Sequence, residues 1–148
     1  MTEILFYHLE SQPLERVLPQ LLEKTLERGW RAVVETASSE RATAIDALLW
    51  TWRDDSFLPH GIAGDESDRD QPVLIATDES NGNDANVRFF VDRAVPRSGG
   101  GYERLVYLFS GHDPDAVTEA RTAWKALGEG NALTYWQQDA SGRWQKRG

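Results

Sequence analysis

Apolar runs of strand length alternate with helical repeats over the first 52 residues. Residues 3–9, EILFYHL, and residues 30–36, WRAVVET, each have the length of a buried strand. Residues 13–29 carry leucine and valine at helical spacing. Residues 38–52 predict a second helix that begins with a serine cap. The apolar residues on one of its faces are Ala42, Ile45, Leu48, Leu49 and Trp52. This order of strand, helix, strand and helix predicts an α/β protein with a partly parallel sheet.

The first helix contains a residue that opposes it. An interior proline such as Pro19 costs a helix about 3 kcal/mol, because it removes a backbone hydrogen bond and crowds the preceding turn. We therefore expect a kink at Pro19 or a helix that begins later. Gly29 is placed to follow the last turn of this helix.

The rest of the chain predicts further strands and one more helix. Residues 53–71 contain proline, glycine and many acids, so we expect mostly loop there. Asp113, Pro114 and Gly128 mark the cap, first turn and end of a last helix. Apolar runs predict strands over 72–77, 87–95 and 102–110, and a closing strand and turn that suits a hairpin over 131–146. No repeat or linker divides the chain, so we expect one domain over residues 1–148.

Composition and charge narrow the classes of function. The chain has no cysteine and no apolar run longer than a strand, and its N-terminus carries an acid where a secretory signal has basic residues. We expect a cytoplasmic protein without disulfides. The net charge of −8 opposes direct, non-specific binding of nucleic acid. A local basic patch on such a chain would suit a small acidic element.

No enzyme signature stands out. Gly99–Gly101 precede a strand and no Gly-Lys-Ser/Thr follows, so they do not form a phosphate-binding P-loop. The histidines His8, His60 and His112 lack the spacing of metal ligands, and Ser110 lacks the surroundings of a hydrolase nucleophile. We predict no catalytic residue, cofactor or metal. A small α/β enzyme whose active site is assembled from distant residues remains an alternative.

Aromatic residues gather at the end of the second helix and in the loop beyond it. Trp50 lies about 100° around the helix from Leu49, at the edge of the apolar face, and Phe57 follows in the loop. The pair has two interpretations of equal weight. It anchors a long loop to the core, or it forms a docking point for a protein partner. For Trp52, packing in the core is a sufficient explanation.

The last helix presents a second candidate surface. Trp124 lies at the boundary of the face that packs on the sheet, Val117 is on the same side, and Arg121 and Lys125 face water. The packing face itself is a stripe of mostly small residues, namely Ala116, Ala120, Ala123 and Leu127. The two cations are ordinary solvated surface, or they form with Trp124 a pocket for an acidic peptide that has an aromatic end.

The order of these features resembles the chi subunit family of bacterial DNA polymerase III. The similarity rests on FYHL, ALLW followed by SFLPHGIAGD, the strand PVLIAT, and the late AR…AWKALG helix before a last strand. It spans essentially the whole chain, and SFLPHGIAG after ALLW is its most specific part. It implies an α/β fold of Rossmann-like or P-loop-NTPase-like shape, with a sheet flanked by helices and no P-loop.

The resemblance also implies a non-catalytic role and two partners. Chi proteins link the clamp loader, through the psi subunit, to the acidic C-terminal tail of single-stranded-DNA-binding protein, which ends in Phe. Val117, Arg121, Trp124 and Lys125 match the family's tail site, with Trp124 in place of the more usual Tyr. Trp50 and Phe57 match the aromatic pair used against psi or a DNA-repair helicase. An adaptor that serves such a helicase instead of the replicase is an alternative function.

Overall fold

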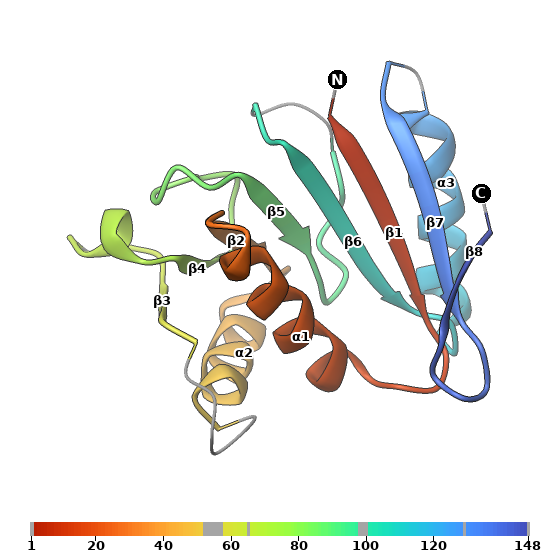
Figure 1. Cartoon of the computed structure of the whole chain (residues 1–148), viewed down its shortest axis with the longest axis horizontal. Coiled ribbons are helices and arrows are strands. Elements are labelled where there is room, and N and C mark those ends of the chain that lie inside the picture. Colours follow the sequence, from red (N-terminus) through yellow and green to blue (C-terminus); the bar gives the residue numbers. More distant parts are fainter. Residues whose placement is uncertain (1, 52–57, 65, 98–100, 129, 148) are drawn as a thin grey trace.

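The computed structural model describes residues 2–51, 58–64, 66–97, 101–128 and 130–147, and it folds them into one eight-stranded sheet with three α-helices (Figure 1). The elements in chain order are β1 (Glu3–Leu9), α1 (Leu14–Glu27), β2 (Ala32–Glu35), α2 (Ser39–Thr51), β3 (His60–Ile62), a short 3₁₀ helix (Asp68–Asp70), β4 (Val73–Ala76), β5 (Val87–Phe90), β6 (Arg104–Ser110), α3 (Pro114–Leu127), β7 (Ala132–Gln138) and β8 (Trp144–Lys146).

The sheet is parallel except at one edge. Its strand order is β3-β4-β2-β5-β6-β1-β7-β8, and only the β7–β8 pair, a hairpin as expected, is antiparallel. The connections that leave the neighbouring strands β1 and β6 run in opposite directions across the sheet: β1 leads through α1 to β2, and β6 leads through α3 to β7. The α/β fold class predicted from the sequence, with helices flanking the sheet, is therefore confirmed.

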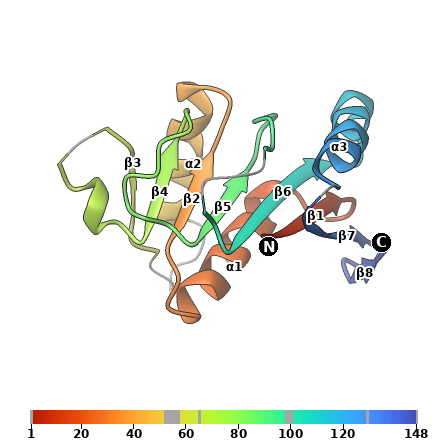
Figure 2. The same ribbon diagram turned by 90° about the horizontal axis from the view of Figure 1, so that it is seen from above.

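The two faces of the sheet carry separate apolar cores, because successive side chains of a strand point to opposite faces. α1 and α2 pack on one face and α3 on the other. Figure 2 shows α1 and α3 on opposite sides of the strands. In β1, Leu5 and Leu9 join the core beneath α1 and α2, whereas Ile4 and Phe6 join the core beneath α3. This alternation decides which residues of β1 lie under the candidate site.

Loops complete the α3 face of the sheet where no helix of the described chain covers β2, β4 and β5. Glu35, at the end of β2, accepts hydrogen bonds from Arg88 of β5 (2.9 and 2.6 Å) and from Arg97 (3.0 and 2.7 Å). Arg88 is 2% exposed and also donates to the carbonyl oxygens of Asp78 and Ser80. This buried ion pair thereby fastens the loop after β4 to the sheet.

Several predicted boundaries differ from the structure. α1 begins at Leu14 and continues through Pro19, so the expectation of a later start is wrong: Val17, Leu18 and Leu22 are buried and their packing offsets the lost hydrogen bond. The strand expected over 87–95 ends at Phe90, because Asp92 and Arg93 adopt positive φ angles of 49° and 72°. The region expected to be mostly loop contributes the edge strand β3.

Candidate partner-binding site on α3

α3 forms where its sequence predicts. The Asp113 carboxylate accepts hydrogen bonds from the backbone N–H groups of Asp115 (3.0 Å) and Ala116 (3.3 Å), and Pro114 occupies the first helical position. Buried on the sheet are Ala116, Ala120 and Leu127, with Ala123 partly buried beside them. Because most of these side chains are small, α3 lies close to the strands, and the larger residues at the edge of the stripe reach the rings of the sheet.

Trp124 rests on an aromatic floor formed by Phe6 of β1 and Tyr135 of β7. Its ring meets Phe6 edge to face at 5.3 Å between centroids and 80° between planes, and it meets Tyr135 at 5.7 Å and 77°. Phe6 is fully buried, whereas Trp124 and Val117 are only half-buried against the same core. The arrangement leaves a fixed apolar surface facing outward along α3.

Two cations border this surface. Arg121 and Lys125 are exposed, and neither forms an ion pair or hydrogen bond with another residue in the part of the chain that the structure describes. Burial raises the pKa of the Tyr135 hydroxyl, and the positive charge of Arg121 opposes that rise, so the guanidinium lies within electrostatic reach of the floor. An apolar surface beside two uncompensated cations suits a carboxylate-bearing ligand with an aromatic group.

His8 lies next to the floor and orders it. Its Nδ1 is 2.6 Å from the Tyr135 hydroxyl and its Nε2 is 2.8 Å from Oε1 of Glu10. Burial lowers the pKa of His8 below its usual value, although the nearby Glu10 carboxylate acts in the opposite direction. A neutral imidazole fits this environment, because its Nδ1 accepts from the Tyr135 hydroxyl, while Nε2 lies beside the Glu10 carboxylate without the geometry of a hydrogen bond.

The second surface expected from the sequence is described only in part. Trp50, at the end of α2, is 57% exposed, so of its two interpretations the structure supports surface over core. Its ring lies 4.9 Å from that of His60, which is buried and bonds to the carbonyl oxygens of Leu58 (2.6 Å) and Asp46 (3.2 Å). Phe57 lies outside the described residues, as does Trp52, so their placement is not tested.

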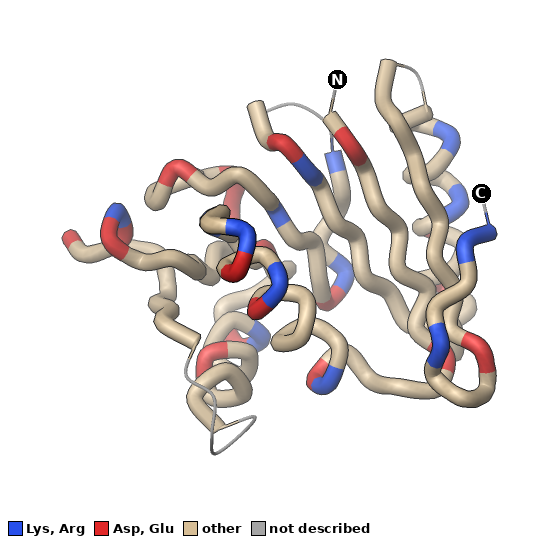
Figure 3. Tube along the Cα trace, in the orientation of Figure 1, with Lys and Arg blue, Asp and Glu red and all other residues tan. Residues whose placement is uncertain are grey.

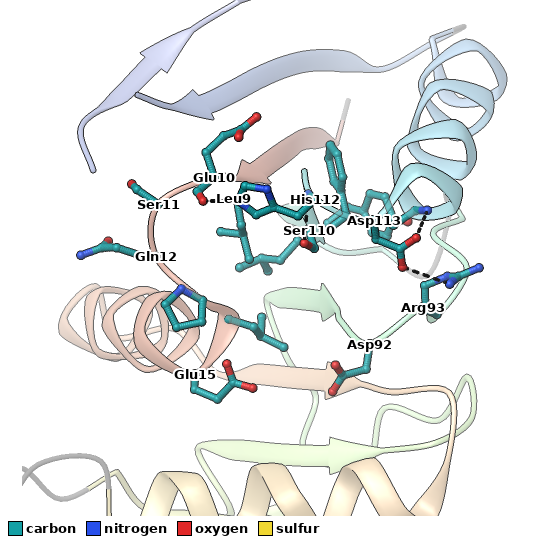
Figure 4. Close-up of a pocket in the computed structure, with 16 residues that line it drawn as sticks. Leu9, Glu10, Ser11, Gln12, Glu15, Asp92, Arg93, Ser110, His112 and Asp113 are labelled. Atoms are coloured by element: carbon teal, nitrogen blue, oxygen red, sulfur yellow. Dashed lines mark hydrogen bonds and ion pairs between the residues drawn. The ribbon is translucent and has the colours of Figure 1, made fainter. Parts of the chain in front are cut away.

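A cavity of about 410 Å³ lies at the carboxyl ends of β1 and β6 (Figure 4). This is where the connections of the sheet diverge, and it is where nucleotides bind in many open α/β sheets. Here the wall carries four carboxylates, from Glu10, Glu15, Asp92 and Asp113. Arg93 is held by Glu119 at 2.6 and 2.7 Å and lies 3.4 Å from Asp113. The charge of this cavity therefore opposes the binding of phosphate.

The loop between β1 and α1 also differs from a phosphate-binding loop. Its backbone N–H groups at Glu10, Ser11 and Gln12 all donate to Oε1 of Gln138, at 3.1, 3.3 and 3.1 Å. The Gln138 amide donates in turn to Oε1 of Gln12 at 3.0 Å. Successive N–H groups that converge in this way form the kind of concavity that holds an anion in P-loop proteins. In this chain a side chain of β7 occupies it.

Neither a metal site nor a membrane-spanning helix is found in the described residues. These residues contain no group of three or more histidine, aspartate or glutamate side chains placed to hold a metal ion. Within the same ranges, no helix has the length and apolar character needed to cross a membrane.

The sequence located the helix surface and missed its floor. Helical periodicity placed Val117, Arg121, Trp124 and Lys125 together on α3, as the structure has them. Phe6 and Tyr135 come from strands far apart in the chain, and the parallel register of β1 and β7 makes them neighbours. The strand alternation that puts Phe6 and His8 on one side of EILFYHL was the available signal.

A solved structure is similar in fold. It is the C-terminal domain of the DEAD-box protein Dbp5, with a TM-score of 0.54 and 14% sequence identity over 90% of both chains. At this identity the likeness concerns the fold alone. It agrees with the P-loop-NTPase-like shape of the sheet.

Sequence comparisons identify relatives. The DNA polymerase III subunit chi of Pseudomonas aeruginosa is 33% identical over 86 residues, and the probable DNA polymerase III subunit chi of Rickettsia prowazekii is 26% identical over 87 residues. These matches cover 56% and 59% of this chain and 59% and 53% of the relatives, so little more than half of each relative's length is matched. The model of the family described as DNA polymerase III chi subunit, HolC, matches residues 1–133. With that match over most of its length, the chain belongs to the DNA polymerase III chi subunit family.

Proposed function

We propose that this protein is a non-catalytic adaptor of the DNA polymerase III holoenzyme. In this role α3 binds the acidic C-terminal tail of single-stranded-DNA-binding protein, and a separate surface binds the psi subunit and so the clamp loader. The observation that carries the proposal is the pairing of a half-buried Trp124 with two exposed cations, Arg121 and Lys125, that have no partner in the described chain.

The chemistry of the tail matches this surface group by group. Its carboxylates suit Arg121 and Lys125, since a guanidinium binds a carboxylate through two parallel hydrogen bonds. Its terminal phenyl ring suits the apolar surface of Val117 and Trp124, which the aromatic floor holds in place. A chain with a net charge of −8 gains in selectivity here, because its surface as a whole repels an acidic peptide while this local patch attracts one.

The direct test is a titration of the protein with a peptide that copies the tail of the source organism's single-stranded-DNA-binding protein, followed by intrinsic tryptophan fluorescence. We expect saturable binding that weakens as salt is added. The Arg121→Ala variant should lose about 1–3 kcal/mol of binding free energy, the usual scale for a lost charge-assisted contact. A control peptide without the terminal phenylalanine should bind far more weakly.

Arg16→Ala supplies the matched control, because Arg16 is an exposed arginine of α1 on the opposite side of the sheet from α3. It should bind the peptide as the unmodified protein does. Normal binding by Arg121→Ala would refute the assignment of the site. No binding by the unmodified protein, in calorimetry as well, would refute the tail-binding function itself.

For the second surface we propose Trp50, together with Phe57, as the contact with psi. The exposure of Trp50 supports this role, since a tryptophan that remains 57% exposed at a helix end is an effective anchor for a partner. A DNA-repair helicase is the alternative partner. Affinity capture with the protein and with its Trp50→Ala variant distinguishes them: the partner that the variant loses, psi or helicase, is the one this surface binds.

A further inference from the structure

A second aromatic surface lies on the sheet face opposite α3. Strand alternation and register place three rings there on adjacent strands: Tyr7 of β1, Trp136 of β7 and Trp144 of β8. Tyr7 is paired with Trp136 across the strands, and its ring meets that of Trp144 edge to face at 5.0 Å. We refer to these three residues as the sheet platform.

α1 packs against β1 on this side of the sheet, where it borders Tyr7. No helix of the described chain covers β7 and β8 on the side that faces away from α3 (Figures 1 and 2). Trp136 is only half-buried, and it has no ring contact and no side-chain hydrogen bond with another described residue. The indole of Trp136 is thus fixed by β7, and its ring and its N–H group are available to a ligand.

Cations border the platform at both ends. Lys146 of β8 is exposed and pairs with Trp136 across the strands, so it emerges beside the indole. At the other end a hollow of about 220 Å³ between α1 and the sheet reaches Tyr7 and is lined by three cations, Lys24, Arg28 and Arg104.

Most of this positive charge is uncompensated. Arg104 is paired with Glu3 at 2.9 Å, but Lys24 and Arg28 form no ion pair within the described ranges. Figure 3 shows basic residues on β8 and, alternating with acidic ones, at the end of α1. The lining of the hollow itself contains no acid.

We infer that the sheet platform binds a short stretch of single-stranded nucleic acid, a few nucleotides long. Bases stack on exposed aromatic rings while the phosphates follow cations, and this combination is the general mode of binding to single strands. The platform offers both on one face: Trp136 and Trp144 for bases, and Lys146 with the basic hollow for phosphates. An acidic peptide would use the cations and leave the indole planes without a role.

The overall charge of −8 favours a short bound segment, because the acidic remainder of the surface repels a long polyanion. From this charge we expect no direct binding of nucleic acid. The inference departs from that expectation on this face alone, where the phosphates of a short segment meet Lys24, Arg28 and Lys146. The inference goes beyond the proposed adaptor function, and the two surfaces are on opposite faces of the sheet.

The experiment is fluorescence anisotropy with a labelled oligothymidylate of about 12 nucleotides and the full chain at low salt. We expect saturable binding that weakens steadily with added salt. Trp136→Ala should reduce the affinity about tenfold, and Trp136→Phe should retain most of it, because a phenyl ring still stacks. Lys146→Glu, at an exposed position that does not threaten folding, should also weaken binding and lower its salt dependence.

Arg121→Ala separates this inference from the tail site. It should leave oligonucleotide binding unchanged while it weakens binding of the tail peptide. A labelled oligoglutamate peptide of similar charge tests the alternative ligand. The inference is overturned by no oligonucleotide binding at low salt, by equal affinity for the oligoglutamate, or by normal oligonucleotide binding in both Trp136→Ala and Lys146→Glu.

Discussion

Trp124 meets Phe6 edge to face, with ring centroids 5.3 Å apart, so the residue we assign to a binding surface is also part of the core. Mutations can distinguish its contribution to stability from its contribution to binding. Trp124→Ala should lower the free energy of unfolding by about 2 kcal/mol, below the range for a fully buried tryptophan because Trp124 is half-buried. Arg121→Ala should change stability by less than about 0.5 kcal/mol. Urea denaturation measures both, and equal losses would show that Arg121 has a structural role.

The buried pair of Glu35 and Arg88 gives a second prediction. Glu35→Gln should destabilise the fold by about 3 kcal/mol, because it leaves the nearly inaccessible Arg88 guanidinium without its counter-charge. Glu79→Gln is the control: Glu79 pairs with Arg97 at 3.2 Å on the surface and should contribute less than about 1 kcal/mol. If chemical denaturation finds the two variants alike, the pair does not hold the loop after β4 to the sheet.

His8 predicts a pH dependence of stability. Because burial lowers its pKa in the folded state, the unfolded chain binds a proton more readily, and stability falls as the pH drops below about 6.5. The contribution is fully present above that pH and is lost as the pH falls through the lowered folded pKa. His8→Gln should flatten this slope without altering the slope above about pH 7.5. The measurement is the free energy of unfolding as a function of pH for the unmodified protein and for His8→Gln. Identical slopes below about pH 6.5 would show that His8 does not cause the pH dependence.

Gln138 supplies a fourth prediction. Gln138→Leu removes the acceptor shared by the N–H groups of Glu10, Ser11 and Gln12, and should cost about 2–3 kcal/mol. Gln138→Glu keeps an acceptor oxygen and should cost less. Thermal unfolding shows which of the two variants is the less stable. The reverse order would mean that the amide bond to Gln12, and not the shared oxygen, holds this loop.

Gly111 gives a steric prediction. A methyl group at this position would lie 2.2 Å from Nε2 of His8, whose ring is confined by Phe109 and Tyr135. Gly111→Ala should therefore displace His8, break its contact with the Tyr135 hydroxyl and cost about 1–3 kcal/mol. The histidine ring signals in an NMR spectrum report the displacement. Unchanged signals would show that the backbone at Gly111 moves instead.

Local patterns in the sequence predicted what local interactions determine. The cap at Asp113, the small-residue stripe of α3 and the outward direction of Arg121 and Lys125 all follow from helical periodicity, and the structure confirms them. Pro19 shows where this reasoning fails, because the burial of its neighbours outweighs a local penalty.

Features that depend on strand register could not be predicted. Nothing near Trp124 in the sequence indicates Phe6 or Tyr135, which reach it only through the pairing of β1 with β7. The sheet platform has the same origin, since Tyr7 and Trp136 are brought together by that pairing. β3 was missed because a three-residue edge strand leaves too short a pattern to recognise.

The contact between Gln138 and the β1–α1 loop has a consequence for the evolution of this fold. The oxygen that fills the loop belongs to a residue 126 to 128 positions away in the chain, so it is a tethered ligand. A dissolved nucleotide would have to compete with an acceptor whose effective concentration is set by the fold itself. In the folded protein Gln138 therefore blocks these N–H groups from binding a phosphate. The surfaces on α3 and at Trp50 can therefore change for partners without disturbing a nucleotide site in this loop.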